Sequence, residues 1–208
     1  MGYNPDADYD LNPKPKPKGK CFPANTQVYT KDGIKYIEDV QVGDLIHDGE
    51  GFSEVWVYAH YDITTAVIYY HIQTEKNTIL ISEEHFLDVK DPNQASTISK
   101  MANQVTTDDC LINKIGMPEK ILKIEKKEGL GMFAPFTLSG KILVNEIRAS
   151  CYAVVEPTLA HGALEDLRAM YKDPAKKNKL GDLLKPDQMG IPQVFHEAFK
   201  SLLNVETV

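Results

Sequence analysis

The sequence predicts an all-β domain followed by a short α-helical C-terminal appendage. From Cys21 onward, short segments alternate β-branched or aromatic residues with polar ones, and turn signals such as Asp48-Gly49 separate them. After Pro157 the apolar residues recur with the period of a helix. Before Cys21, lysines alternate with prolines and apolar residues are few. We therefore expect a disordered leader over 1–20, a β domain over 21–156 and a helical region over 157–208.

The predicted strands run from shortly after Cys21 to Val155. Each is bounded by residues that favour turns, such as Lys31-Asp32-Gly33 and Ser139-Gly140. In order, they are Gln27–Thr30, Ile34–Tyr36, Leu45–His47, Glu54–Tyr61, Ala66–Thr74, Thr78–Ile81, Leu111–Asn113, Lys120–Lys126, Ile142–Val144 and Ser150–Val155.

A weak internal repeat adds detail to the β domain. Residues 40–46 resemble residues 105–111, and each stretch enters a predicted strand after a polar loop. This similarity predicts two related β units with pseudo-two-fold symmetry. The alternative is chance similarity between two short turn-and-strand segments.

The region after Pro157 contains two amphipathic patterns, joined by a connection rich in proline, glycine and lysine. Apolar residues at helical spacing define one face in each pattern. The first face comprises Leu159, Ala163, Leu167 and Met170, and the second comprises Val194, Ala198, Phe199 and Leu202.

Composition and charge exclude several classes of protein. The 208 residues include 42% hydrophobic ones, enough for one substantial core and an appendage. A formal net charge of -7 argues against nucleic-acid binding, which requires a concentrated basic face. No apolar stretch is long enough to span a bilayer, and Met1 to Asp10 is too polar for a secretory signal.

The three cysteines, Cys21, Cys110 and Cys151, cannot form a disulfide framework. Each can be a reactive thiol, a buried apolar residue or one half of a single pair. The histidines show no metal-ligand spacing with these cysteines. We expect no structural metal and no cofactor.

Four motifs stand in a fixed order along the β region. They are Cys-Phe-Pro-Ala-Asn-Thr at 21–26, Leu-Ile-Ser-Glu-Glu-His-Phe at 80–86, Phe-Ala-Pro-Phe-Thr at 133–137 and Ala-Ser-Cys-Tyr-Ala-Val at 149–154. Together they resemble the C-terminal autoprocessing domain of Hedgehog proteins, a member of the Hint family shared with inteins. The resemblance covers roughly Cys21 to His161. It implies a Hint fold, single-turnover self-cleavage and a substrate that is the upstream segment of the same precursor.

The side chains of the first two motifs suit the first step of such a reaction. A thiol beside its own upstream carbonyl has a very high effective concentration, which favours an N-to-S acyl shift at Lys20-Cys21. The resemblance assigns to His85 the protonation of the departing nitrogen. Ser82 stands where the family usually has threonine, and its hydroxyl can hold the scissile amide out of resonance. The alternative is that Ser82 and His85 form a turn with a surface histidine.

A second step needs a base for the attacking nucleophile. In Hedgehog proteins an aspartate is thought to activate a sterol hydroxyl, and the alignment places His60 at that position. Imidazole is a stronger base than carboxylate. Asp62, two residues further on, is an alternative base on the same strand face, and an ordinary strand residue is the alternative role for His60. Lys20 stands where the family usually has glycine and crowds a bulky acceptor, which favours water or a thiol.

The resemblance suggests that Cys151 pairs with Cys21 in a disulfide during secretion. A buried strand cysteine is the alternative for Cys151. Cys110 lies outside every motif, and we expect a structural role for it.

The predicted helices occupy the position of the sterol-recognition region of Hedgehog proteins. We expect their apolar residues to bind a sterol or other lipid acceptor, or to contact a membrane surface. Packing on the β domain is the alternative. By the same resemblance we expect processing in the secretory pathway. The candidate acceptor-binding residues are Leu164, Leu167, Met170, Phe195, Phe199 and Leu202.

Three other functions compete with autoprocessing. Protein splicing is disfavoured because residues 203–206 lack the histidine of a downstream splice junction. A Cys-His hydrolase acting in trans is disfavoured because Cys21 adjoins a disordered leader rather than a formed pocket. A degenerate Hint domain kept as a binding or secretion module is consistent with the departures at Lys20 and His60.

Overall fold

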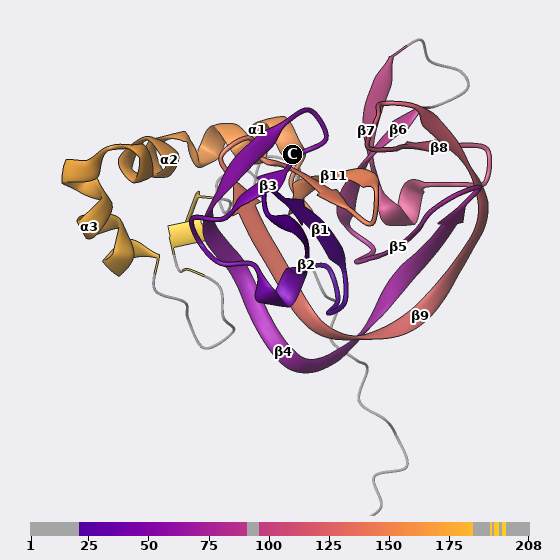
Figure 1. Ribbon diagram of the computed structural model, residues 1–208, viewed down its shortest axis with the longest axis horizontal. Helices are drawn as coiled ribbons and strands as arrows, with labels where there is room; N and C mark the ends of the chain where they lie inside the picture. The colour runs from indigo at the N-terminus through magenta and orange to yellow at the C-terminus, as the bar shows by residue number, and fades with distance from the viewer. Residues whose placement is uncertain (1–20, 91–95, 185–191, 193, 196, 199–208) are drawn as a thin grey trace, which may run out of the picture.

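Two long antiparallel strands form the frame of the molecule. The computed structural model describes residues 21–90 and 96–184, together with residues 192, 194, 195, 197 and 198. β4 (Phe52–Thr74) pairs with β9 (Pro118–Thr137) from Val55↔Thr137 to Thr74↔Ile121. In Figure 1 these strands run side by side across the β domain and connect its two halves. The predicted all-β fold with a helical appendage is confirmed.

The other strands continue this sheet on both sides of the β4–β9 pair. β1 pairs with β2, β3 and β10, whereas β6 pairs with β7, β8 and β11. Their bounds are β1 Gln27–Thr30, β2 Gly33–Tyr36, β3 Leu45–His47, β5 Thr78–Ile81, β6 His85–Lys90, β7 Thr97–Met101, β8 Cys110–Ile112, β10 Lys141–Val144 and β11 Ile147–Ala153.

One predicted break in the sheet is wrong. The segments Glu54–Tyr61 and Ala66–Thr74 belong to the single strand β4. The pairing register shifts between Asp62 and Ala66, where the Asp62 carboxylate accepts hydrogen bonds from the backbone N–H groups of Thr64 and Thr65. The extra residues are thus accommodated as a bulge, and the strand continues beyond it.

Strands β6 and β7 were absent from the predicted set. In β6, four of six side chains, including the consecutive His85, Phe86 and Leu87, are buried. A strand covered on both faces lacks the polar-apolar alternation on which strand prediction depends.

The internal repeat corresponds to a duplicated structure. A 3-10 helix, η1 (Ile37–Asp39), precedes β3, and an equivalent one, η2 (Ala102–Gln104), precedes β8. In each unit a lysine pairs with an aspartate at 2.8 Å, Lys35 with Asp44 and Lys100 with Asp109. The structure therefore supports two related β units.

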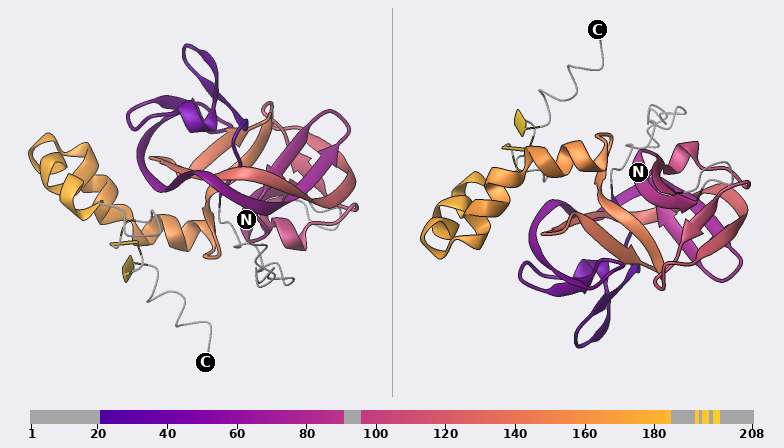
Figure 2. Two further views of the ribbon diagram at one scale, coloured as in Figure 1. Left: turned by 90° about the horizontal axis from the view of Figure 1, so that it is seen from below. Right: turned by 90° about the horizontal axis from the view of Figure 1, so that it is seen from above.

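The appendage contains three described helices, α1 (Pro157–Ala163), α2 (Glu165–Lys172) and α3 (Pro174–Leu183). Figure 2 shows them projecting to one side of the β domain. The prediction of one helix through Leu167 and Met170 is wrong because Leu164 leaves helical geometry between α1 and α2. The segment expected as a connection begins with Asp173 as N-cap and Pro174 at the first turn, and it is helical.

Aromatic contacts attach this appendage to β4 and β9. The Tyr171 hydroxyl donates to Glu54 Oε1 at 2.6 Å. The Phe195 ring stacks on Phe136 at 5.5 Å between centroids and lies 6.1 Å from Trp56. Leu167, Tyr171 and Phe195 are thus part of the protein core, whereas Leu159 of the first predicted face is exposed.

Candidate functional site

Cys21 is the first residue that the structure describes, and it is held against β9. The next residue, Phe22, exchanges two backbone hydrogen bonds with Phe133, each 2.9 Å long, and Ala24 N–H donates to Leu130 O at 2.8 Å. The Cys21 side chain is fully buried. A buried thiol fixed on its C-terminal side by a strand is well placed for a reaction at its own N-terminal bond.

A turn between β5 and β6 wraps around the Cys21 carbonyl. Ser82 N–H donates to Cys21 O at 3.2 Å, and His85 N–H donates to Ser82 O at 3.1 Å. Both side chains are buried, and neither Ser82 Oγ nor His85 Nδ1 has a hydrogen-bond partner. Two unsatisfied polar atoms in one buried turn are uncommon in native proteins and indicate a functional element.

The hydrogen bonds of His85 define its tautomer. His85 Nε2 lies 2.8 Å from Ser150 O, and a carbonyl only accepts, so Nε2 carries the proton and Nδ1 is an acceptor. Burial lowers the His85 pKa to about 4, although the Ser150 carbonyl opposes the shift. The ring is therefore neutral at pH 7, with no spare proton for a leaving group. The alternative of a surface histidine is wrong because His85 is fully buried.

His60 reaches the thiol from β4. Its Nδ1 lies 3.5 Å from Cys21 Sγ, and its backbone pairs with Ala134 on β9. Asp62, the alternative base, uses both carboxylate oxygens in hydrogen bonds with Thr64 and Thr65, which lower its pKa. The structure thus brings His60 to the sulfur and commits Asp62 to the bulge in β4.

Tyr69 is a buried polar residue of this region that sequence reasoning missed. Its hydroxyl donates to Gly131 O at 2.5 Å, and its ring lies against the backbone of Gly129. A β-carbon on Gly129 would stand 2.8 Å from the Tyr69 ring and 3.0 Å from Pro23. Burial, reinforced by the nearby Cys21, raises the Tyr69 pKa. A tyrosine in an alternating strand gives no sequence signal of such a location.

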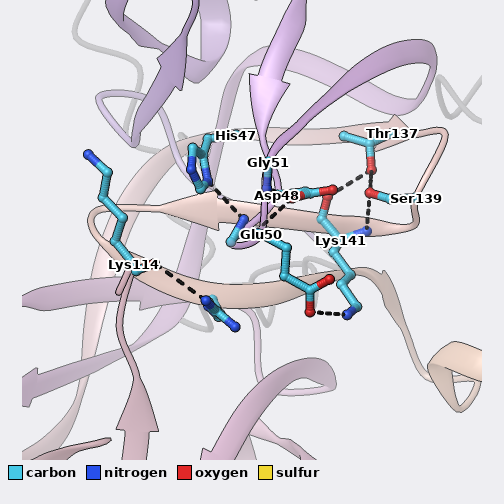
Figure 3. A network of polar contacts seen from close by, with 10 residues as sticks. His47, Asp48, Glu50, Gly51, Lys114, Thr137, Ser139 and Lys141 are labelled. Atoms are coloured by element: carbon cyan, nitrogen blue, oxygen red, sulfur yellow. Dashed lines mark hydrogen bonds and ion pairs between the residues drawn. The ribbon is translucent and has the colours of Figure 1, made fainter. Parts of the chain in front are cut away.

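Cys151 belongs to a different set of contacts. Its Sγ lies 3.4 Å from Thr137 Oγ1, which also lies 3.2 Å from Ser139 Oγ and donates to Lys141 O at 2.7 Å. Figure 3 shows this Thr137–Ser139–Lys141 network next to the turn after β3. Burial raises the Cys151 pKa to about 11. No disulfide joins Cys21, Cys110 or Cys151 in this structure, so the expected pairing of Cys21 with Cys151 is absent.

The predicted acceptor surface is not exposed. Leu164, Leu167 and Phe195 are buried in the core, and Met170 is partly buried against it, so they form no open apolar face. Phe199 and Leu202 lie outside the described residues, as does Lys20. Among the described residues, no helix is long and apolar enough to cross a bilayer.

Helices α2 and α3 instead line a partly open apolar cavity of about 400 Å³ against β4. Tyr61, next to His60 in the chain, lines the cavity and packs edge-on against Phe133 at 5.1 Å. This places the cavity wall beside the segment that holds Cys21. The lining residues are Val42, Trp56, Val57, Tyr58, Tyr61, Tyr171, Lys177, Leu180, Gly181 and Leu184.

In the part of the chain that the structure describes, no three histidine, cysteine, aspartate or glutamate side chains gather into a metal-binding group.

The sequence matches the Hint module family over residues 12–180. The chain belongs to this family. Among its relatives, Indian hedgehog B protein of Danio rerio is 30% identical over 176 residues, 74% of this chain and 42% of that protein. Sonic hedgehog protein of the same organism is 33% identical over 172 residues, 74% and 40% of the two chains. Warthog protein 6 of Caenorhabditis elegans is 30% identical over 144 residues, 64% of this chain and 24% of that protein.

This Hint chain therefore spans less than half the length of these relatives. Its structural neighbours include a gp41-1 intein, with a TM-score of 0.53 and 28% identity over 62% of this chain and 97% of the intein. The bacterial intein-like domain from Clostridium thermocellum has a TM-score of 0.53 at 17% identity, covering 63% of this chain and 98% of that domain, and it shows the shared fold.

Proposed function

We propose that this Hint chain cleaves itself at the Lys20-Cys21 bond. Cys21 Sγ attacks the Lys20 carbonyl carbon as the thiol proton leaves, and the C–N bond of the scissile peptide breaks. The Cys21 nitrogen takes up a proton and becomes a free amine, and the upstream segment becomes a thioester on Cys21.

The observation that carries this proposal is that His60 contacts the Cys21 sulfur and Ser82 the Cys21 carbonyl. His85 lies against the next residue, with its ring centroid 4.4 Å from that of Phe22. Membership of the Hint family supports the same chemistry.

The two polar atoms without hydrogen-bond partners in the turn after β5, Ser82 Oγ and His85 Nδ1, can both act in the first step. His85 Nδ1, as an acceptor, can bind the N–H of the scissile amide, and the Ser82 hydroxyl can hydrogen-bond the same peptide group. Hydrogen bonds that twist or polarise an amide reduce its resonance and raise the energy of the ground state toward the transition state. In this assignment His85 positions the bond, and the proton for the departing nitrogen comes from another group.

In the second step we assign His60 as the base. It accepts the proton of an attacking hydroxyl, whose oxygen bonds to the thioester carbonyl as Cys21 sulfur leaves. The contact between His60 Nδ1 and Cys21 Sγ supports this assignment. The thioester carbonyl carbon is bonded to that sulfur, so an oxygen that attacks this carbon comes close to His60. Water, or a larger alcohol, is the acceptor.

We propose that an apolar alcohol, such as a sterol, binds in the cavity between β4 and the tail helices, and that processing takes place in the secretory pathway. Gly181 lines this cavity, and a β-carbon there meets no atom within 4 Å. Gly181→Leu fills the cavity, and we expect it to remove any sterol-dependent acceleration of cleavage. Gly162→Leu in α1 is the matched control, because it also meets no neighbour and lies away from the cavity lining.

The first test is cleavage by an added nucleophile. We incubate the purified chain with dithiothreitol or hydroxylamine and measure intact masses. We expect two fragments separated at Lys20-Cys21, none from Cys21→Ala, and the wild-type rate from Cys110→Ala. Cleavage of Cys21→Ala at the wild-type rate would contradict the proposal, and absence of cleavage in the wild type would favour a degenerate domain. A hydrolase acting in trans is disfavoured because the Cys21 thiol is fully buried.

A further inference from the structure

Trp56 brings a hydrogen-bond donor without an acceptor to the wall of the cavity between β4 and helices α2 and α3. Trp56 lines this cavity and is 1% exposed, and its Nε1 has no hydrogen-bond partner. The indole packs against the rings of Tyr171 and Phe195, at 6.2 and 6.1 Å between centroids. A buried indole N–H usually finds an acceptor, because an unsatisfied donor costs free energy. The acceptor for Trp56 is therefore expected from a ligand.

The other polar side chains of the cavity wall already have partners. Three tyrosine hydroxyls donate to backbone or carboxylate oxygens, and one lysine ammonium lies over an aromatic ring. They belong to Tyr58, Tyr61, Tyr171 and Lys177. The remaining lining residues are aliphatic or glycine. Among the lining residues that the structure describes, Trp56 Nε1 is thus the polar atom left for a ligand.

On the basis of the proposed function, we infer that the cavity binds a lipid alcohol with a second oxygen, to which Trp56 Nε1–H donates a hydrogen bond. Trp56 precedes His60 by four residues on β4, which corresponds to about 13 Å along an extended strand. His60 contacts the Cys21 sulfur, where the reacting hydroxyl must arrive. An oxygen bound to Trp56 is too far from this sulfur to attack the thioester, so it is a different oxygen of the ligand.

The cavity follows the same stretch of β4. Trp56 lines it, and so does Tyr61, which follows His60 directly in the chain. A ligand that lies along the strand can therefore place one end near His60 and the other at Trp56. The volume of about 400 Å³ is within the usual range of small-molecule sites. The ligand class is an elongated apolar alcohol with a hydroxyl, ketone or ether oxygen at the end remote from the reacting hydroxyl.

Two probes of equal length test the second oxygen. One is dodecanol, and the other is its analogue with an ether oxygen in place of the carbon next to the terminal methyl group. Calorimetry measures both dissociation constants for the full chain with Cys21→Ala, which forms no thioester, and for that chain with Trp56→Phe. We expect loss of the N–H to shift the ratio of the two constants about tenfold in favour of dodecanol, the effect of one hydrogen bond.

Tyr61→Phe is the matched control, because the hydroxyl that it removes from the cavity wall already donates to Glu38 O. We expect the parent ratio from this variant. Trp56 is the single tryptophan of the chain, so benzothienylalanine can replace it specifically. This analogue has sulfur in place of the N–H and keeps the shape of the ring, which separates loss of the donor from loss of volume. We expect the same tenfold shift.

A ratio that stays at the parent value in both folded Trp56 variants would overturn the inference. Failure of the proposed function gives a different result. If neither alcohol binds, or if both bind Gly181→Leu as tightly as the parent, the cavity is not the acceptor site, whichever oxygens the acceptor carries. Binding of both probes that Gly181→Leu abolishes, together with a ratio that depends on the Trp56 N–H, supports both proposals.

Discussion

The first β unit (residues 27–74) and the second β unit (residues 85–137) share a backbone design but differ in their surroundings. Each contains a 3-10 helix that ends at a valine, Val40 or Val105, with nearly the same extended dihedral angles. In the first unit, the Asp44 side chain is 25% exposed and its lysine partner 37% exposed. In the second unit, Asp109 is 2% exposed and its partner Lys100 22%. The same ion pair is therefore a surface feature in one unit and a core feature in the other.

The chemical groups are divided between these units as well. The first unit carries His60, and the second begins with His85, whereas Cys21 and Ser82 stand in the segments just before each unit. The site forms only where the two units meet. This comparison teaches that the two units share a backbone frame and differ in the side chains that they bring to their junction.

The largest expected effect is on the cleavage rate, and it distinguishes a proposed site residue from a residue that only supports the fold. His85→Gln removes the acceptor Nδ1, and we expect it to slow dithiothreitol-dependent cleavage at least about a hundredfold. Asp44→Asn alters the frame of the first unit, and we expect it to cleave at the wild-type rate. Intact-mass kinetics measure both. Equal rates for the wild type and a folded His85→Gln variant would remove His85 from the site.

A second prediction concerns acid stability and the buried ring of the second unit. The His85 pKa is about 4 in the folded chain against 6.5 as its ordinary value, so below pH 6.5 the unfolded state binds a proton that the native state refuses. Stability is therefore lost as the pH falls from 6.5 to about 4. We expect roughly 3 kcal/mol of loss from this group. Urea unfolding of wild type and His85→Gln between these pH values measures it, and parallel losses in the two proteins would contradict it.

The paired aspartates give a third, smaller effect. Asp109→Asn removes the carboxylate that pairs with Lys100 and accepts the Thr106 N–H. We expect a loss of about 2 kcal/mol in the free energy of unfolding. Asp44→Asn, at the more exposed pair, is expected to cost less than about 1 kcal/mol. Urea denaturation at neutral pH compares the variants, and equal losses would show that burial does not distinguish the two units.

The smallest effect is the pH dependence of the exposed pair. Burial alone would raise the Asp44 pKa, but hydrogen bonds from Lys35 and from the backbone of Gln41, with the Lys35 charge, lower it below 3.8. The contribution of Asp44 is thus present above pH 3.8 and is lost as the pH falls through the folded pKa. We expect the stability difference between wild type and Asp44→Asn to shrink between pH 5 and pH 3, roughly the window over which a paired carboxylate is protonated. If the stability difference between the two proteins does not change with pH, the Lys35–Asp44 pair is not the source of the pH dependence.

The sequence was most informative where one strand face is covered and the other is open. Gln27–Thr30, Leu45–His47 and Thr78–Ile81 were predicted with the bounds that the structure has. The sequence was least informative for β6, where burial on both faces removes the alternation. The Asp173-Pro174 pair is a helix-start signal that was present in the sequence but was outweighed by the lysines after it.

For the site, ordered motifs identified Cys21, Ser82 and His85, but their mutual geometry depends on long-range strand pairing. No local pattern predicts that His60 approaches the Cys21 sulfur, because the approach depends on the pairing of β4 with β9 and of Phe22 with Phe133. From the sequence alone, Leu164 and Phe195 fit a role in acceptor binding as well as a role in the core. Only packing places them in the core.

The hydrogen bonds that hold Cys21 have a consequence for the product. Those from Phe22 and Ala24 to β9, and that from Ser82 to the Cys21 carbonyl, all involve atoms on the C-terminal side of the Lys20-Cys21 bond. Cutting that bond breaks none of them. The released domain should therefore keep its fold, with a new amino terminus seated at the turn between β5 and β6. The folded product then reacts only once, because the bond that it cleaves is no longer part of it.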